Sequence, residues 1–497
     1  MIARDSDTKA TTTTICIGRD PRAHGEILAD AFARGASSVP QVKVVYTGIA
    51  TTPALFEFCR SSLCDAGVMV TASHLPSDRN GLKFFDDNGG FNKQQIQKMI
   101  GLAQENAQTW FDLGVLPPTS GSNGVFCSEQ VDWMPIYEDR LKEALLKQVK
   151  SSANDDKLPL EGLKIVLNSG NGSGGFFRQV LQDLGANVDG SIHTTPDPQF
   201  PNGVPNPEND SMVQETIQAC EVAHADIGIL LDTDADRCGM VAPRTYSNLV
   251  PSEYEPLNRN RLIAMMGVIY AAQSPGCAIV TDSVTSTGLT PFLEEELGLK
   301  HVRYLRGYAN VIRKAKELND EGLLNAQVAI ETSGHCAVDE NGFLDDGTFT
   351  AVKVLGLLAQ ERQLSPEKSL LERIASLQEL EEVTEFRLTS FDGTLESMDG
   401  LFEFAALEIE NICENEQQKT WVIDPGNLEG IRVSTGADGG YFLLRKSLHD
   451  PVMCLQVEAS SKQSANQDIV RPLLQLFQSH SRIAKILDLS SMEQYED

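Results

Sequence analysis

The sequence predicts an α/β protein with several domains, and three observations support this class. Short apolar runs alternate with amphipathic runs of helical length, which is typical of parallel sheets covered by helices on both faces. The chain has 497 residues, enough for roughly three domains of about 150 residues each. Its 41% apolar and 22% charged residues are typical of an ordinary globular protein.

The predicted elements follow one another in a regular order. The expected strands cover residues 14–18, 42–46, 66–70, 164–167, 226–231, 278–281 and 328–330. The expected helices cover residues 25–36, 53–63, 176–184 and 291–297. We expect a charged helical segment at 364–382, and a last region (384–489) with strands at 440–445 and 453–457 before a terminal helix.

Polar segments suggest where domains meet. Residues 117–123 are rich in Pro, Ser and Gly and residues 150–159 are polar, so one of them is expected to separate a first domain from a second. Residues 243–260 form a further polar stretch, which we interpret as a loop and a second boundary.

The charge of the chain restricts its partners. A formal net charge of −29 argues against nucleic acid or an anionic membrane. A phosphate-binding site would therefore need its own cluster of Arg and Lys, which is workable because fields are screened over about 8 Å at physiological salt.

Other composition features exclude further classes. The ten cysteines contain no Cys-x-x-Cys pair, so a zinc ribbon or a thioredoxin-like site has no support. The longest apolar stretch, residues 262–272, is too short to span a bilayer. The first residues resemble neither a signal peptide nor a transit peptide, so we expect a cytoplasmic location.

A first candidate site follows the apolar run at residues 66–70. Ser73 and His74 come next in a loop of Pro, Ser, Asp, Asn and Gly, and Lys83 follows ten residues after Ser73. Ligands of α/β proteins bind at the carboxyl ends of strands. The sequence therefore predicts a reactive hydroxyl at Ser73.

A second candidate site carries three acidic residues. Asp232, Asp234 and Asp236 directly follow an apolar run, and their mutual repulsion favours a bound cation. Oxygen ligands suit Mg²⁺ before Ca²⁺, and an EF-hand is excluded because Arg237 and Pro243 occupy its Gly and closing Glu positions. Arg237 would bind an anion beside the metal; a solvated acidic turn is the alternative.

A third candidate site combines Glu331, Ser333 and His335 after a short apolar run. These side chains could hold sugar hydroxyls, and a histidine can exchange a proton near neutral pH. A purely structural histidine is the alternative.

A fourth candidate site is basic. Arg445, Lys446, Ser447 and His449 offer donors within five residues and could hold a phosphate. Arg19 and Arg22 are further candidates. For either arginine pair, the alternative is a surface face of salt bridges.

The segment Gly170-Asn-Gly-Ser-Gly-Gly175 formally fits the dinucleotide-binding pattern. Asp189 lies near the distance expected for a ribose contact. The segment is so rich in glycine that a chance match is the better explanation, so we do not favour a nicotinamide or flavin enzyme.

Taken together, the four motifs resemble those of the α-D-phosphohexomutase superfamily, which includes phosphoglucomutase and phosphomannomutase. The segments are Thr71-Ala-Ser-His-Leu-Pro76, Asp232-Thr-Asp-Ala-Asp-Arg237, Glu331-Thr-Ser-Gly-His335 and Arg445-Lys-Ser-Leu-His-Asp-Pro451. Smaller likenesses lie at residues 18–22, 200–207 and 306–308. The Leu-Pro after the serine and the Ser-Leu-His-Asp-Pro ending most resemble a plant and algal branch.

The resemblance implies three mixed-sheet α/β domains and a C-terminal α+β domain around a central cleft. The expected boundaries are residues 1–122, 123–245, 246–372 and 373–497. It also implies a phosphohexomutase that interconverts hexose 1-phosphate and hexose 6-phosphate through a phosphoserine and a 1,6-bisphosphate.

The resemblance implies roles for individual residues. The catalytic residues would be Ser73, His74, Lys83, Arg237 and His335. Mg²⁺ would be held by Asp232, Asp234, Asp236 and an oxygen of phosphorylated Ser73. The substrate would be bound by Arg19, Arg22, Gly307, Tyr308, Glu331, Ser333, Arg445, Ser447 and His449. The cofactors would be Mg²⁺ and a hexose bisphosphate such as glucose 1,6-bisphosphate, and the partner a small sugar phosphate; a monomer and a dimer are both open.

Two departures from the family pattern leave alternatives. Family members carry an Arg-Gly pair on an earlier first strand, whereas only fourteen residues precede Ile15 here. This motivates a catalytically impaired homologue that binds sugar phosphates or a partner protein; a phosphoserine phosphohydrolase is a third possibility. The second departure is Thr233, where many members have Gly, which is tolerable if its backbone angle is ordinary.

Overall fold

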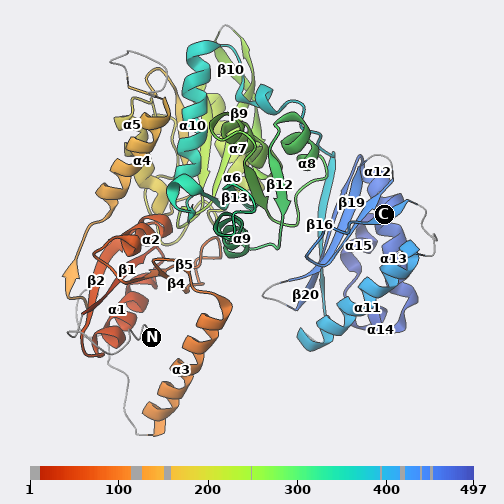
Figure 1. Ribbon diagram of the computed structural model, residues 1–497, viewed down its shortest axis with the longest axis horizontal. Helices are drawn as coiled ribbons and strands as arrows, with labels where there is room; N and C mark the ends of the chain where they lie inside the picture. The colour runs from red at the N-terminus through yellow and green to blue at the C-terminus, as the bar shows by residue number, and fades with distance from the viewer. Residues whose placement is uncertain are drawn as a thin grey trace. The chain divides into compact units, whose positions relative to one another are not determined.

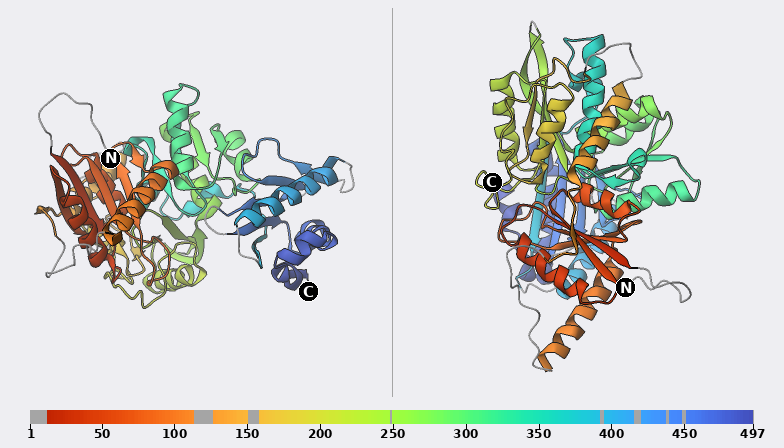
Figure 2. Two further views of the ribbon diagram at one scale, coloured as in Figure 1. Left: turned by 90° about the horizontal axis from the view of Figure 1, so that it is seen from below. Right: turned by 90° about the vertical axis from the view of Figure 1, so that its left-hand side faces the viewer.

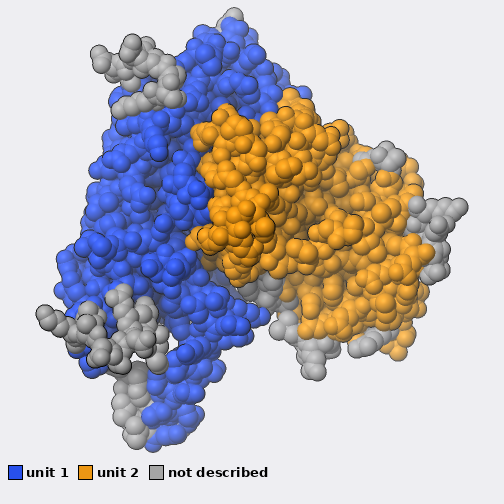
Figure 3. Space-filling model, in the orientation of Figure 1, with its two compact units in different colours: residues 1–269, 333–373 blue, residues 270–332, 374–497 orange. Residues whose placement is uncertain are grey.

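The computed structural model describes residues 12–112, 126–149, 158–247, 249–391, 395–414, 420–436, 439–447 and 451–496. The chain forms two compact units, coloured separately in Figure 3. Unit 1 contains Met1–Ile269 and Ser333–Arg373, and unit 2 contains Tyr270–Thr332 and Ile374–Asp497. The polar segments 117–123 and 150–157 lie outside the described residues, so the predicted domain boundaries stay a prediction.

The first sheet of unit 1 has six strands in the order β5-β4-β3-β1-β2-β6. The strands are β1 (Thr13–Arg19), β2 (Val42–Ile49), β3 (Ala66–Val70), β4 (Leu82–Asp86), β5 (Gly89–Gly90) and β6 (Glu129–Gln130). β1 pairs in parallel with β2 and β3, whereas β4 is antiparallel to β3. The serine loop, residues 71–81, therefore connects two neighbouring strands at one end of this sheet.

Helices α1 (Gly25–Ser37) and α2 (Thr52–Arg60) cover opposite faces of the first sheet (Figure 1). Ile17 packs in one core with Ala29 of α1, whereas Cys16 Sγ lies 3.9 Å from the Leu55 carbonyl oxygen of α2. Successive side chains of a strand point to opposite faces, so each helix buries one side of β1. Helix α3 (Lys93–Asp112) follows the sheet in the chain.

The second sheet of unit 1 has the order β10-β9-β8-β7, with strands β7 (Ile165–Asn168), β8 (Ile227–Leu231), β9 (Cys238–Ser247) and β10 (Val250–Leu257). β8 pairs in parallel with β7 and antiparallel with β9. The six residues 232–237 are therefore a tight connection between two buried strands; we call them the acidic loop. Helices α4 (Met134–Val149), α5 (Phe177–Asp183) and α6 (Asp210–Ala223) belong to the same part of the chain.

The prediction of a loop at residues 243–260 was wrong. The second half of β9 and all of β10 form an antiparallel ladder in which Tyr254 pairs with Pro243. β10 is an edge strand, and an edge strand tolerates polar side chains and prolines such as Pro251 because one side of its backbone faces no partner strand. The polar composition of these residues therefore led to a loop being predicted where the structure has a β-hairpin.

The prediction of a helical segment at residues 364–382 was also wrong. Helix α10 (Gly347–Leu364) ends where that segment begins, and only a short 3-10 turn at Leu370–Ile374 follows before β16. Pro366 lies two residues beyond the helix and cannot continue it. Helix α10 shows no periodic pattern of apolar residues because it is buried on most of its sides.

Unit 2 contains a parallel set of strands and an antiparallel sheet. β11 (Ala278–Thr281) pairs in parallel with β12 (Lys300–Arg303) and β13 (Ala326–Ile330), and helix α9 (Tyr308–Asp320) packs on β13. The antiparallel sheet has the order β16-β20-β19-β18-β17, from β16 (Glu382–Thr389), β17 (Trp421–Ile423), β18 (Ile431–Thr435), β19 (Gly440–Lys446) and β20 (Val452–Ala459). Helices α11 (Leu395–Glu414) and α13 (Arg471–Ser479) share a core with this sheet (Figure 2).

These elements confirm the predicted class of mixed α/β domains followed by a C-terminal α+β domain. The arrangement around a central cleft stays a prediction. No helix within the described ranges is long and apolar enough to cross a membrane.

Candidate active site

Three segments of unit 1 bring their polar side chains together. Ser73 Oγ lies 3.2 Å from Asp232 Oδ2 and 3.3 Å from His74 Nδ1. Ser73 has a φ angle of 51°, which is the left-handed region that few non-glycine residues adopt. The hydroxyl that the sequence singled out is therefore held next to the acidic loop.

Arg22 holds the serine loop in place. Its guanidinium donates to the carbonyl oxygens of Ser73 (2.6 Å), Leu75 (2.6 Å), Pro76 (2.5 Å) and Arg79 (3.2 Å). Its Nε donates to Asp20 Oδ2 at 3.0 Å, and its side chain is fully buried. Because all three nitrogens are engaged, Arg22 acts on the loop itself, and its predicted contact with substrate stays untested.

The acidic loop concentrates negative charge in a buried place. Asp232, Asp234 and Asp236 are buried, and one oxygen of each lies within 4.8 Å of the others. Burial and the charges of Asp236 and Asp234 raise the pKa of Asp232 well above its usual value. Lys83 Nζ donates to Asp234 Oδ2 at 2.7 Å and Asp236 Oδ2 at 2.5 Å, and this charge lowers the pKa of Asp236 in spite of its burial.

The acidic loop fits a hard divalent cation. Asp234 Oδ1 and Asp236 Oδ1 are buried and accept no hydrogen bond from the described residues. Unpaired oxygens of buried carboxylates are costly without a cation. Oxygen-only ligands suit Mg²⁺, so Asp232, Asp234 and Asp236 are the residues that would hold it.

His335 is fixed between a donor and an acceptor. Arg237 Nε donates to His335 Nε2 at 2.9 Å, and His335 Nδ1 lies 2.7 Å from Asp345 Oδ2. Burial disfavours the charged ring, but Asp345 raises the pKa of His335 to about 9. The hydrogen bond from Arg237, however, can form only if His335 Nε2 carries no proton. These contacts therefore describe the neutral ring with its proton on Nδ1.

His74 differs from His335. Burial, followed by the charge of Arg237, lowers the pKa of His74 to about 3. His74 is therefore neutral near pH 7 and can exchange a hydrogen bond with the Ser73 hydroxyl.

The glycine-rich segment packs against the acidic loop. A Cβ on Gly172 would lie 2.7 Å from the Thr233 carbonyl oxygen, and one on Gly175 would lie 1.8 Å from that of Thr194. Ser173 N donates to the Thr233 oxygen at 2.7 Å. These glycines serve close packing within the protein, which agrees with rejecting a dinucleotide site.

The departure at Thr233 has no cost in backbone strain. Among the described residues with positive φ, the acidic loop contributes Ala235 (φ 60°) and not Thr233. Thr233 therefore needs none of the freedom of glycine.

Unit 2 carries three of the predicted substrate-binding residues, Gly307, Tyr308 and Glu331. Glu331 Oε1 accepts a hydrogen bond from Gly307 N at 2.5 Å, and Tyr308 begins α9. Burial, followed by the charge of Glu331, raises the pKa of Asp282 to about 7. Ser333 is buried and belongs to unit 1.

The predicted phosphate-binding residues lie at the end of β19. Arg445 Nη2 lies 3.2 Å from Glu385 Oε2, and Arg306 Nη1 lies 3.9 Å from the same oxygen. Ser447 N donates to the Val452 carbonyl oxygen at 2.8 Å. His449 lies outside the described residues. Arg387 Nη1 lies 3.6 Å from the other oxygen of Glu385, so three arginines gather around this carboxylate.

Arg19 lies at the end of β1. Its Nε donates to Tyr46 Oη at 3.0 Å and its Nη1 to the Asp20 carbonyl oxygen at 3.1 Å. Its Nη2 lies 3.6 Å from Glu26 Oε2, so each of the three guanidinium nitrogens of Arg19 has a partner within the protein.

Two residues near these groups were not singled out from the sequence. Thr52, the first residue of α2, donates through its Oγ1 to Asp234 Oδ2 and through its N to the Asp234 carbonyl oxygen at 2.9 Å. Asp345 orients His335. Neither belongs to one of the motifs, so only the contacts in the structure identify them.

Comparison with protein-family models decides the relationship. The models described as phosphoglucomutase/phosphomannomutase, alpha/beta/alpha domains I, II and III match residues 1–109, 137–245 and 258–378, respectively. The chain belongs to the phosphoglucomutase/phosphomannomutase family. The predicted likeness to a plant and algal branch stays a prediction.

Curated relatives agree with this family. A phosphomannomutase/phosphoglucomutase of Pseudomonas syringae is 27% identical over 90% of this chain and 83% of its own length. The alignment with a protein of the same name from Pseudomonas putida, also 27% identical, spans 70% of this chain and 66% of that protein. A probable phosphoglucosamine mutase of Methanopyrus kandleri is 26% identical over 92% of this chain and 90% of its own length. The names of these relatives do not favour the alternative that this chain is a catalytically impaired homologue.

Solved structures share the fold. A phosphoglucomutase/phosphomannomutase family protein of Burkholderia thailandensis has a TM-score of 0.69 at 23% identity and covers 94% of this chain and 89% of its own. An N-acetylphosphoglucosamine mutase of Aspergillus fumigatus, solved with GlcNAc-6P and magnesium, has a TM-score of 0.56 at 13% identity and covers 95% of this chain and 84% of its own. At these identities the likeness concerns the fold.

Proposed function

We propose that this chain is a Mg²⁺-dependent phosphohexomutase that interconverts hexose 1-phosphate and hexose 6-phosphate. The observation that carries the proposal is the position of Ser73 Oγ, 3.2 Å from the first carboxylate of a buried acidic loop. A hydroxyl beside a site for a hard cation suits a phosphoryl carrier. Family membership and the names of the relatives support the same reaction.

The proposed reaction has two balanced transfers. The phosphoryl group of phosphorylated Ser73 leaves Oγ and bonds to the free hydroxyl oxygen of the sugar phosphate; the proton of that hydroxyl is released to a base and Ser73 Oγ takes up a proton, which gives a hexose 1,6-bisphosphate and a free serine. The other phosphoryl group of the bisphosphate then returns to Ser73 Oγ, so the sugar is isomerised and the phosphoserine restored. Phosphoryl transfer asks the protein chiefly for positioning and for neutralisation of charge.

The residues of unit 1 supply most of these needs. Bound Mg²⁺ would neutralise charge on the phosphoryl oxygens. Arg22 keeps the serine loop in one conformation, and Arg237 and Lys83 add positive charge beside Asp232–Asp236. Lys83 and His335 are the proposed proton-transfer residues; Nε2 is the His335 atom able to accept a proton, because Nδ1 faces Asp345.

The residues of unit 2 supply the proposed recognition of the sugar phosphate. Glu331, with Ser333 of unit 1, would bind hydroxyl groups. Arg445 and Ser447 would bind the phosphate that is not being transferred, and Gly307 and Tyr308 would contact the sugar ring. These roles rest on the motif resemblance and on the charge of the Arg445–Arg306 pair.

A direct assay tests the proposal. The full chain is incubated with glucose 1-phosphate, Mg²⁺ and a trace of glucose 1,6-bisphosphate, and the sugar phosphates and free phosphate are followed by ³¹P NMR. We expect glucose 6-phosphate, together with a phosphoryl mass on the peptide that contains Ser73. Absence of both would contradict the proposal, and free phosphate without isomerised sugar would indicate a phosphohydrolase.

The preferred hexose needs a panel of substrates. Mannose 1-phosphate and glucosamine 1-phosphate are compared with glucose 1-phosphate under the same conditions. The ratio of their kcat/KM values ranks the substrates, because that ratio measures differences in transition-state binding.

A further inference from the structure

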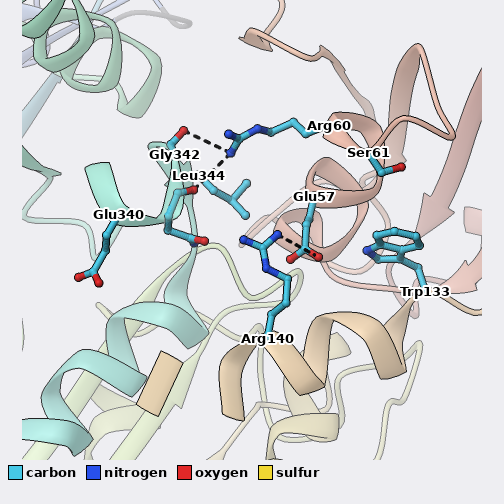
Figure 4. A pocket seen from close by; sticks show the side chains of 9 residues that line it. Glu57, Arg60, Ser61, Trp133, Arg140, Glu340, Gly342 and Leu344 are labelled. Atoms are coloured by element: carbon cyan, nitrogen blue, oxygen red, sulfur yellow. Dashed lines mark hydrogen bonds and ion pairs between the residues drawn. The ribbon is translucent and has the colours of Figure 1, made fainter. Parts of the chain in front are cut away.

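Unit 1 contains a pocket of about 290 Å³ that shares no lining residue with the acidic loop (Figure 4). Its walls come from the end of α2, the start of α4 and residues 340–344. Its lining residues are Glu57, Arg60, Ser61, Trp133, Arg140, Glu340, Asn341, Gly342 and Leu344. This volume lies at the lower end of the range for small-molecule sites.

Two arginines meet at this pocket with hydrogen-bond donors to spare. Arg60 enters from α2, and its Nη1 donates weakly, at 3.3 Å, to the carbonyl oxygens of Asn341 and Gly342. Arg140 enters from α4, and its Nη1 forms an ion pair with Glu57 Oε1 at 3.2 Å. Their other guanidinium nitrogens donate no hydrogen bond to the described part of the chain.

The negative charge around the pocket does not balance these arginines. Glu340 Oε1 is 2.6 Å from Lys353 Nζ, so its charge is already paired. The charge of Glu57 is paired with Arg140, so Arg60 is left with no carboxylate partner among the described residues. In a chain of net charge −29, this pocket is a local site of positive charge.

The pocket also has a firm wall. The Trp133 ring stacks on Phe58 with ring centroids 4.4 Å apart and planes 15° apart. Gly342 lies so close to Arg60 that an added Cβ would be 2.3 Å from Arg60 Nη2. A glycine at this position therefore keeps the guanidinium in the pocket.

We propose that this pocket binds a small dianion, of the kind carried by phosphate monoesters and by di- or tricarboxylates. Two guanidinium groups can each offer paired N–H donors to a phosphate or a carboxylate. The pocket is connected to the acidic loop by α2, whose nine residues run from Thr52 at Asp234 to Arg60.

Calorimetry and tryptophan fluorescence test this proposal on the full chain, with inorganic phosphate and citrate as probes. Each probe is added to the unchanged protein and to the Trp133→Phe variant. The part of the emission change that is lost in the variant comes from Trp133 and reports on this pocket. We expect such a change from at least one probe; stronger binding of phosphate identifies a phosphate monoester as the ligand, and stronger binding of citrate identifies a carboxylate. Absence of the Trp133 signal with both probes up to about 20 mM, far above the Kd expected from several charge-assisted contacts, would overturn the proposal.

Three matched variants separate the pocket from general charge effects. Arg140→Gln should weaken binding roughly tenfold or more, because it removes a charge-assisted contact. Glu57→Gln should tighten binding, because it removes the carboxylate that competes for Arg140. Arg244→Gln should leave binding unchanged: its Nη1 pairs with Glu255 at the same 3.2 Å, and its side chain is similarly exposed, 66% against 53% for Arg140.

The signs of these changes decide the outcome. Equal effects of Arg140→Gln and Arg244→Gln would overturn the proposal, since the loss would then reflect net charge. Weaker binding in Glu57→Gln would also overturn it. Circular dichroism of each variant shows whether the fold is kept, and Arg60→Gln provides a second removal of positive charge should Arg140→Gln unfold.

Discussion

Ser73 Oγ lies within 3.2 Å of Asp232 Oδ2, although 159 positions separate the two residues in the chain. Ser73 is the third residue of the serine loop of one sheet, and Asp232 begins the acidic loop of another. The folding of unit 1 thus brings together two residues that belong to separate sequence motifs. Four predictions test this unit.

The first prediction concerns the phosphoryl carrier. Ser73→Ala should reduce isomerisation to background and abolish the phosphoryl mass on the protein, because no other atom replaces Oγ. Binding of glucose 6-phosphate, measured by calorimetry, should persist. Ser77→Ala in the same loop is the control and should keep activity; equal loss of binding and of transfer in Ser73→Ala would count against Ser73 as the carrier.

The second prediction concerns the metal. Asp234→Asn should raise the Mg²⁺ concentration needed for half-maximal activity, because it removes one charged oxygen ligand. The measurement is a Mg²⁺ titration of activity, with Asp189→Asn, an exposed aspartate, as the control. An unchanged titration in Asp234→Asn would remove that residue from the ligand set.

The third prediction concerns Arg22. Arg22→Lys should lower the free energy of unfolding by about 2–4 kcal/mol, because a single ammonium cannot reach four carbonyl oxygens and a carboxylate at once. Urea denaturation gives this value. Arg79→Lys, in the same loop but with an exposed side chain, should change stability by less than about 0.5 kcal/mol.

The fourth prediction contrasts two glycines. Gly175→Ala should destabilise the protein by at least about 2 kcal/mol, since its Cβ would meet the Thr194 carbonyl oxygen and the backbone would have to shift. Gly35→Ala in α1 has nothing within 4 Å of the new Cβ and should be neutral or stabilising by about 0.5–1 kcal/mol. Thermal melting of both variants compares them, and equal melting temperatures would contradict the packing argument.

The sequence was sufficient for features that depend on local pattern. Buried strands such as Ala66–Val70 are short apolar runs, and the polar residues that follow them mark the serine and acidic loops. The four motifs, found in one order along the chain, identify the family more specifically than any single motif does. Family membership and fold class could therefore be predicted.

The features that were missed lack the local pattern that usually marks such elements. α10 has no polar face, because other elements cover most of its sides, so periodicity could not reveal it. The β9–β10 hairpin looked like a loop because an edge strand tolerates prolines. The contacts of the Arg22 guanidinium with the carbonyl oxygens of residues 73–79 likewise emerge only from the fold, and its predicted role in substrate binding stays a prediction.

The left-handed backbone at Ser73 restricts which hydroxyl amino acid can stand there. Threonine has the same reactive group, but its branched Cβ is disfavoured at φ 51°. A change from serine to threonine would keep a hydroxyl group at this position but would strain the backbone of the serine loop. The main chain at position 73 therefore favours serine over threonine, independently of what the hydroxyl group does.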